Sequence, residues 1–133
     1  MKLTHLINKP VEVVFSYLTD MQKFTSVHPV ISKINHLYSN TYMVYETLNF
    51  GFVPISFTYP VTVESDFDKK IVIIKAKVMG MSDIKMTFVL SDKKNRSLID
   101  ESIEISSILP IKSIIQNIFK KQHLVLFQNI ENQ

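Results

Sequence analysis

The chain has 133 residues, of which 46% are hydrophobic and 20% are charged, and this is enough for one domain with its own core. It contains no Cys, which excludes a disulfide framework, a thiolate metal site and a cysteine nucleophile and is typical of a reducing compartment. The net charge of +3 comes from 15 basic and 12 acidic residues scattered along the chain, which favours a solvated surface over a nucleic-acid-binding patch.

The N-terminal part predicts a short strand followed by two short helices. The strand covers Lys2 to Ile7. Asn8 is a suitable N-cap and Pro10 suits a first helical turn, so a helix should follow at once. Apolar residues recur at spacings of three and four from Val11 to Leu18, and Met21 to Val27 indicates a second short helix.

From residue 30 onward the apolar residues recur every two positions, which is typical of strands. The clearest strand begins at Val53, where apolar residues alternate with polar ones and with Pro54 and Pro60. Two prolines in one strand predict an edge or a bulge. The expected strands cover residues 31–37, 41–50, 53–64, 71–79, 84–90 and 97–106. Short polar turns between them predict an antiparallel meander.

A long amphipathic helix is expected from about residue 110 to residue 130. Its apolar face is predicted to contain Ile111, Ile114, Ile115, Ile118, Phe119, Val125, Leu126 and Ile130. Gln122 lies near the middle of this face and needs a polar partner there. Leu124 and Phe127 are expected on the opposite side, where they are either harmless or mark a homodimer contact or a site for a protein partner.

Together these elements predict one α+β domain that spans residues 1–133. Its curved antiparallel sheet of six to seven strands grips the long C-terminal helix, and one or two short helices follow the first strand. Pockets form at seams of this kind between a helix and a sheet.

The segment from Ile7 to Asp20, INKPVEVVFSYLTD, with Lys23 after it, resembles the opening of the START-like (SRPBCC) superfamily. That group includes bacterial polyketide cyclase/dehydrase and lipid-transport homologues and has the helix-grip fold of the birch-pollen allergen. The resemblance continues through the strands to the proline-initiated last helix. It implies a deep apolar cavity between sheet and helix, which in different members holds lipids, sterols, polyketides or isoprenoids. The absence of Trp and Cys and the single Arg distinguish this chain from the more polar cyclase-type pockets.

Glu101 is the most informative polar residue, because Ile99, Ile103 and Ile105 share its strand face. An inward carboxylate would be desolvated and could act as an acid or a base. The alternative is that Glu101 reaches water or pairs with a lysine. Gln122 could orient the polar end of a ligand or bond a backbone carbonyl. The predicted ligand-binding residues are Phe57, Tyr59, Ile74, Met86, Phe88, Glu101, Ile103, Ile118, Gln122 and Val125.

The pattern of residues predicts no metal site and no cofactor. The histidines are His5, His28, His36 and His123, which lie in separate elements without ligand spacing. With two Gly the chain has no phosphate-binding glycine motif, and no Ser sits in a nucleophile elbow.

The function that we expect is binding, or transport in the sense of a carrier, of a hydrophobic small molecule. One alternative is a cyclase/dehydrase-type enzyme with Glu101 as general base, and another is an interaction module whose cavity is only structural. No stretch approaches the ~20 apolar residues of a membrane span, so we expect a cytoplasmic protein.

Overall fold

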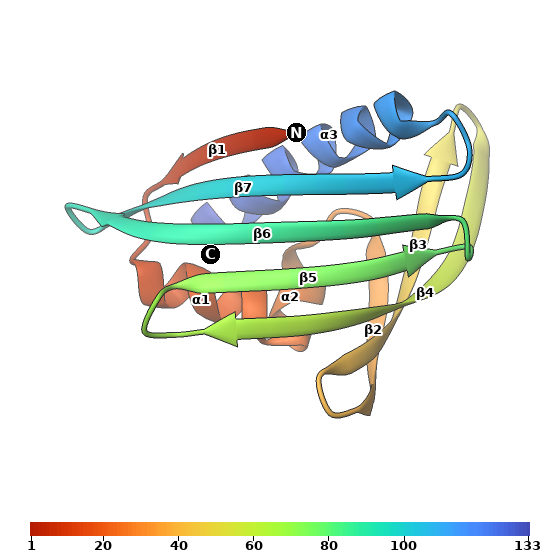
Figure 1. Ribbon diagram of the computed structural model, residues 1–133. Helices are drawn as coiled ribbons and strands as arrows, with labels where there is room; N and C mark the ends of the chain where they lie inside the picture. Colours follow the sequence, from red (N-terminus) through yellow and green to blue (C-terminus); the bar gives the residue numbers. More distant parts are fainter.

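A curved antiparallel sheet carries all three helices on one of its faces (Figure 1). The computed structural model describes residues 1–133. The elements are β1 (Lys2–Ile7), α1 (Val11–Thr19), α2 (Met21–Val27), β2 (Ile31–Tyr38), β3 (Thr41–Phe50), β4 (Val53–Asp66), β5 (Ile71–Val78), β6 (Ser82–Lys93), β7 (Arg96–Ser107) and α3 (Lys112–Glu131). The predicted class is confirmed: a seven-stranded sheet grips a long C-terminal helix, and two short helices follow the first strand.

The strand order is β1-β7-β6-β5-β4-β3-β2, so six consecutive strands form a meander and β1 returns to pair with the last of them. β1 is antiparallel to β7, with Leu3 opposite Glu101 and His5 opposite Ile99. This pairing places the N-terminal strand beside the C-terminal helix, as Figure 1 shows. Side chains from β1, β7 and α3 can therefore meet although they are about 100 residues apart in the chain.

The two prolines of β4 lie where this strand has a neighbour on one side only. Pro54 and Pro60 are paired with β3, whereas the pairing of β4 with β5 starts at Val61, opposite Ala76. Because proline donates no backbone hydrogen bond, a stretch with one free edge tolerates it best. The expectation of an edge-like strand is thus confirmed for the first half of β4.

The helix caps differ in part from the prediction. Pro10, not Asn8, occupies the N-cap of α1, and its side chain makes no cap hydrogen bond. The backbone N–H of Asn8 instead donates to the Glu131 carboxylate at 2.6 Å. Asp20 caps α2, where its Oδ1 accepts from the backbone N–H groups of Gln22 and Lys23 at 3.0 and 3.3 Å. None of the helices is long and apolar enough to cross a membrane.

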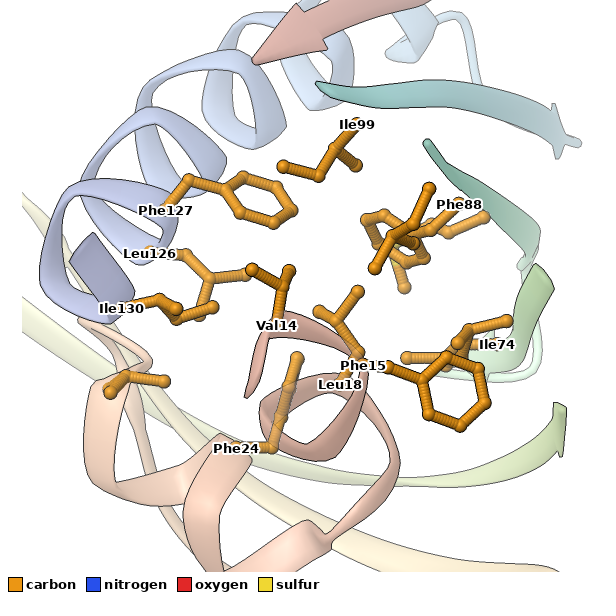
Figure 2. Close-up of a cluster of buried hydrophobic side chains, with 14 of the residues drawn as sticks. Val14, Phe15, Leu18, Phe24, Ile74, Phe88, Ile99, Leu126, Phe127 and Ile130 are labelled. Carbon is orange, nitrogen blue, oxygen red and sulfur yellow. The ribbon is translucent and has the colours of Figure 1, made fainter. Parts of the chain in front are cut away.

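One core of 24 buried hydrophobic residues fills the space between the helices and the sheet. Figure 2 shows Leu126 and Phe127 of α3 projecting toward Val14 of α1 and Ile99 of β7. The rings of Phe127 and Phe88 meet edge to face, with centroids 6.1 Å apart.

The inner face of α3 is rotated from the one that we predicted. Phe127 is 1% exposed and belongs to the core, whereas Val125 is 39% exposed and Leu124 is 53% exposed. Residues 125 and 127 lie about 200° apart around a helix, so both cannot face the sheet. The prediction of an outward pair formed by Leu124 and Phe127 is therefore wrong, and so is the inward position of Val125.

Candidate ligand-binding site

A cavity of about 430 Å³ lies between the sheet and the first half of α3. Its wall is formed by 27 residues from α2, β2 to β6 and α3, and 23 of them are hydrophobic. The N-terminal half of α3 lines the cavity through Ile114, Ile115, Ile118 and Phe119, while the C-terminal half packs on the core. This volume lies within the range of small-molecule sites.

A second depression, of about 670 Å³, lies on the sheet surface over β4 to β7. Only 4 of its 12 lining residues are hydrophobic, and outward-pointing Lys75, Lys85 and Glu104 are among the others. The cavity under α3 is therefore the candidate for an apolar ligand.

Five of the predicted ligand-binding residues line this cavity: Phe57, Tyr59, Ile74, Met86 and Ile118. The other five do not. Phe88, Glu101, Ile103 and Gln122 are buried outside the cavity wall, and Val125 is on the outer side of α3. The cavity ends part-way along the strands: Met86 of β6 lines it, but Phe88, two residues further on the same face, packs against Phe127.

Glu101 projects inward from β7, as the alternation predicts, and it bonds two histidines. Its Oε1 lies 3.3 Å from Nε2 of His5, and its Oε2 bonds Nδ1 of His123. Glu101 and His123 are 1% and 2% exposed. Burial alone would raise the pKa of Glu101, but the hydrogen bonds and charges of His123 and His5 outweigh burial and leave this pKa below its ordinary value. The carboxylate is therefore the stable form, and it accepts from both imidazoles.

The two imidazoles bond opposite oxygens of one carboxylate, so they do not converge on a common point. No group of three or more His, Cys, Asp or Glu side chains in the structure could hold a metal ion. His123 also lines the cavity, and no protein group bonds its Nε2. Because no fully buried side-chain nitrogen or oxygen lacks a partner, this nitrogen has access to the cavity. The arrangement presents to the cavity an imidazole whose tautomer is set from behind by a carboxylate.

Glu46 and Tyr59 form a second polar pair on the cavity wall. The Tyr59 hydroxyl donates to Oε1 of Glu46 at 2.6 Å. Burial raises the pKa of Glu46, and the hydrogen bond from Tyr59 and the charge of His123 oppose that rise. Burial and the adjacent Glu46 raise the pKa of Tyr59 well above its ordinary value, so the phenol keeps its proton.

His28 follows α2 and also lines the cavity. Its Nδ1 accepts hydrogen bonds from the backbone N–H groups of Val30 and Ile31, each at 3.3 Å. Burial, with a smaller contribution from the charge of His123, lowers the pKa of His28 to about 3. The ring is therefore neutral at physiological pH, and its proton is on Nε2.

The sequence analysis missed Glu46, His28 and His123 as cavity residues. Glu46 shares a strand face with Val44 and Leu48, but the opposite face of β3 holds Met43 and Tyr45, so hydropathy did not distinguish the inner side. For His123 a signal was present, because it follows Phe119 by one helical turn.

The sequence matches, over residues 4–122, the family model of CoxG, a protein of carbon monoxide dehydrogenase. The chain belongs to the CoxG family. A search of curated proteins finds no match for this CoxG-family chain.

Solved structures show how widely the fold of this CoxG-family chain is shared. A START superfamily protein from Mycobacterium smegmatis superposes with a TM-score of 0.80 at 11% identity, over 99% of this chain and 94% of that one. Ara h 8.0201 gives 0.80 at 13% identity, with coverage of 99% and 94%. The Zhui aromatase/cyclase from Streptomyces sp. R1128 gives 0.71 at 8% identity, with coverage of 99% and 90%. These similarities establish the START-like helix-grip fold that the sequence resemblance predicted.

Proposed function

We propose that this CoxG-family chain binds one hydrophobic small molecule, of the lipid, isoprenoid or polyketide kind, in the cavity under α3. The observation that carries the proposal is a cavity of about 430 Å³ with 23 hydrophobic residues among its 27 lining residues. Burying apolar ligand surface contributes roughly 25 cal/mol per Å², less the cost of immobilising the ligand. The polar groups on the wall would orient the ligand.

The size of the cavity supports occupancy over a purely structural void. Protein interiors contain few voids larger than a water molecule. At ~24 cal/mol per Å³, a sealed empty cavity of this volume would cost about 10 kcal/mol, which is comparable with the whole stability of a domain. Water that fills such a space meets few polar groups on these walls, so an apolar ligand is the favoured occupant.

A pair of tryptophan substitutions on α3 tests the proposal. Ile118 lines the cavity and Leu124 is exposed on the same helix, and the chain has no other Trp. Ile118→Trp should occupy cavity volume and abolish uptake of fatty acids, isoprenoids and aromatic polyketide mimics, measured by native mass spectrometry. Leu124→Trp should leave uptake unchanged. Equal uptake by the two variants would contradict binding in this cavity.

The second candidate is a cyclase/dehydrase-type enzyme, and the contact between Glu101 and His123 favours it. Glu101 does not line the cavity, so the general base would be His123, with Glu101 holding its ring. Glu101→Gln would then leave ligand binding intact and abolish turnover. Unchanged turnover in that variant would exclude this role. The interaction-module alternative has lost the surface on which it relied, because Phe127 is buried.

A further inference from the structure

Four hydrogen-bonding side chains lie close together on the cavity wall: His28, Glu46, Tyr59 and His123, here called the head-group site. Glu46 bonds Tyr59 directly. Ile31 connects His28 to Glu46, because its N–H donates to the His28 ring and the residue pairs with Glu46 across β2 and β3. The charge of His123 acts on both His28 and Glu46. A ligand in this cavity therefore meets its polar partners at one place.

His28 supplies a donor to the head-group site. Two backbone N–H groups occupy its Nδ1, so the proton of the neutral ring is on Nε2. No protein group accepts from Nε2, and no fully buried nitrogen lacks a partner, so this N–H has access to the cavity. A ligand oxygen that accepts a hydrogen bond would satisfy it.

Glu46 supplies an acceptor. Tyr59 occupies only Oε1 of the carboxyl group, and Oε2 has no protein partner. The proton of the Tyr59 hydroxyl is used in that bond, so the hydroxyl oxygen is a further acceptor. A ligand group must donate a hydrogen to match this side of the site, and it must accept one to match His28.

The charges around the site disfavour an anionic head group. No Lys or Arg is among the 27 lining residues. His5 and His123 are the imidazoles that could become cationic nearby, and Glu101 already bonds both. Glu46 adds another carboxyl group on the wall itself. A buried carboxylate or phosphate would thus have no free cation to balance it, and burying an unbalanced charge is costly.

We infer that the ligand of this cavity carries a neutral hydroxyl group, as an apolar alcohol or phenol, which accepts a hydrogen bond from His28 and donates one to Glu46. A ketone of the same skeleton satisfies only His28, and a carboxylate satisfies neither the donor requirement nor the charge balance. This inference rests on the proposed binding function and specifies the class of its ligand.

Three probes with the same chain length test the inference: 2-dodecanol, 2-dodecanone and dodecanoate, titrated into the full chain at pH 8 by calorimetry. The alcohol should bind about threefold to tenfold more tightly than the ketone, which corresponds to one hydrogen bond. Dodecanoate should bind at least about tenfold more weakly than the alcohol. A ketone that equals the alcohol, or a carboxylate that equals or exceeds it, would overturn the inference while leaving the binding function in place. If none of the three binds, both the function and the inference fail.

A matched pair of variants assigns the selectivity to the site. Glu46→Gln replaces the free acceptor oxygen with an amide that can donate, so the ratio of alcohol affinity to ketone affinity should fall to about one or below. Glu64→Gln makes the same change at an exposed carboxylate of β4 and should leave the ratio unchanged. Partial unfolding of a variant affects both probes equally, so the ratio remains informative. An unchanged ratio in Glu46→Gln would overturn the assignment.

Discussion

His28 should make the stability of this protein depend on pH, and His28→Asn should remove that dependence. The folded state lowers the pKa of His28 from its ordinary 6.5 to about 3, mainly because the ring is buried. Between these values the unfolded chain binds a proton that the folded chain does not, so stability falls as the pH falls below 6.5 and continues to fall until about 3. At 1.36 kcal/mol per pH unit, the loss between pH 6.5 and about pH 4.5 is about 2.7 kcal/mol.

Asparagine is the informative replacement at this position. The Asn side-chain oxygen can accept from a backbone N–H two residues further on, which is the contact that His28 makes with Val30. His28→Asn should therefore keep the local turn, without a titrating group. The assay is urea unfolding followed by circular dichroism at about pH 7.5 and about pH 4.5, for the wild type and the variant.

The comparison of the two proteins cancels the other groups that titrate in this range. We expect the stability of the variant relative to wild type to rise by about 2.7 kcal/mol on going to the lower pH. His36→Asn, at an exposed histidine of β2, should give no such rise. A His28→Asn difference that is the same at both pH values would refute the reasoning, because the folded state would then not resist protonation of His28.

Other predictions test the core, the buried carboxylate and a helix cap. Phe127→Ala should lower the free energy of unfolding by about 3–5 kcal/mol, and Leu124→Ala should change it by about 0.5 kcal/mol or less, in urea unfolding; similar losses would contradict the burial that we describe. Glu101→Gln should destabilise by about 2 kcal/mol at neutral pH, because two bonds to a carboxylate become bonds to an amide. Since folding lowers the pKa of Glu101, this difference should be full above pH 4.5 and shrink as the pH falls through the folded pKa; a constant difference would contradict an ionised Glu101. Asp20→Ala should cost about 1 kcal/mol by removing the cap of α2, and thermal unfolding that matches wild type would exclude a role for the cap.

The sequence predicted the fold well because each element carries its own local pattern. Alternation along β4 to β7 and the proline before α3 required no knowledge of distant contacts. Glu101 was also placed correctly on the inner face of β7, because its neighbours on that face are isoleucines. What local pattern could not supply was the partner: His5 reaches Glu101 only because β1 pairs with β7.

The errors on α3 arose because one helix serves two surroundings. Its first half lines a cavity and exposes Ile114, which is 56% exposed, while its second half packs on the core. We fitted one apolar face to both halves, and the isoleucine-rich first half drew that face toward Val125 and away from Phe127. The cavity wall was likewise mixed with the core behind it, because Met86 and Phe88 share a strand face and differ only in their distance along it.

The most direct test of the account is native mass spectrometry of the protein purified from its own host, followed by solvent extraction of whatever it holds. We predict one apolar molecule per chain, and we expect Ile118→Trp to lose that molecule. A wild-type protein that is empty, and that takes up no fatty acid, isoprenoid or polyketide mimic when these are added, would contradict the proposal that this cavity binds a ligand.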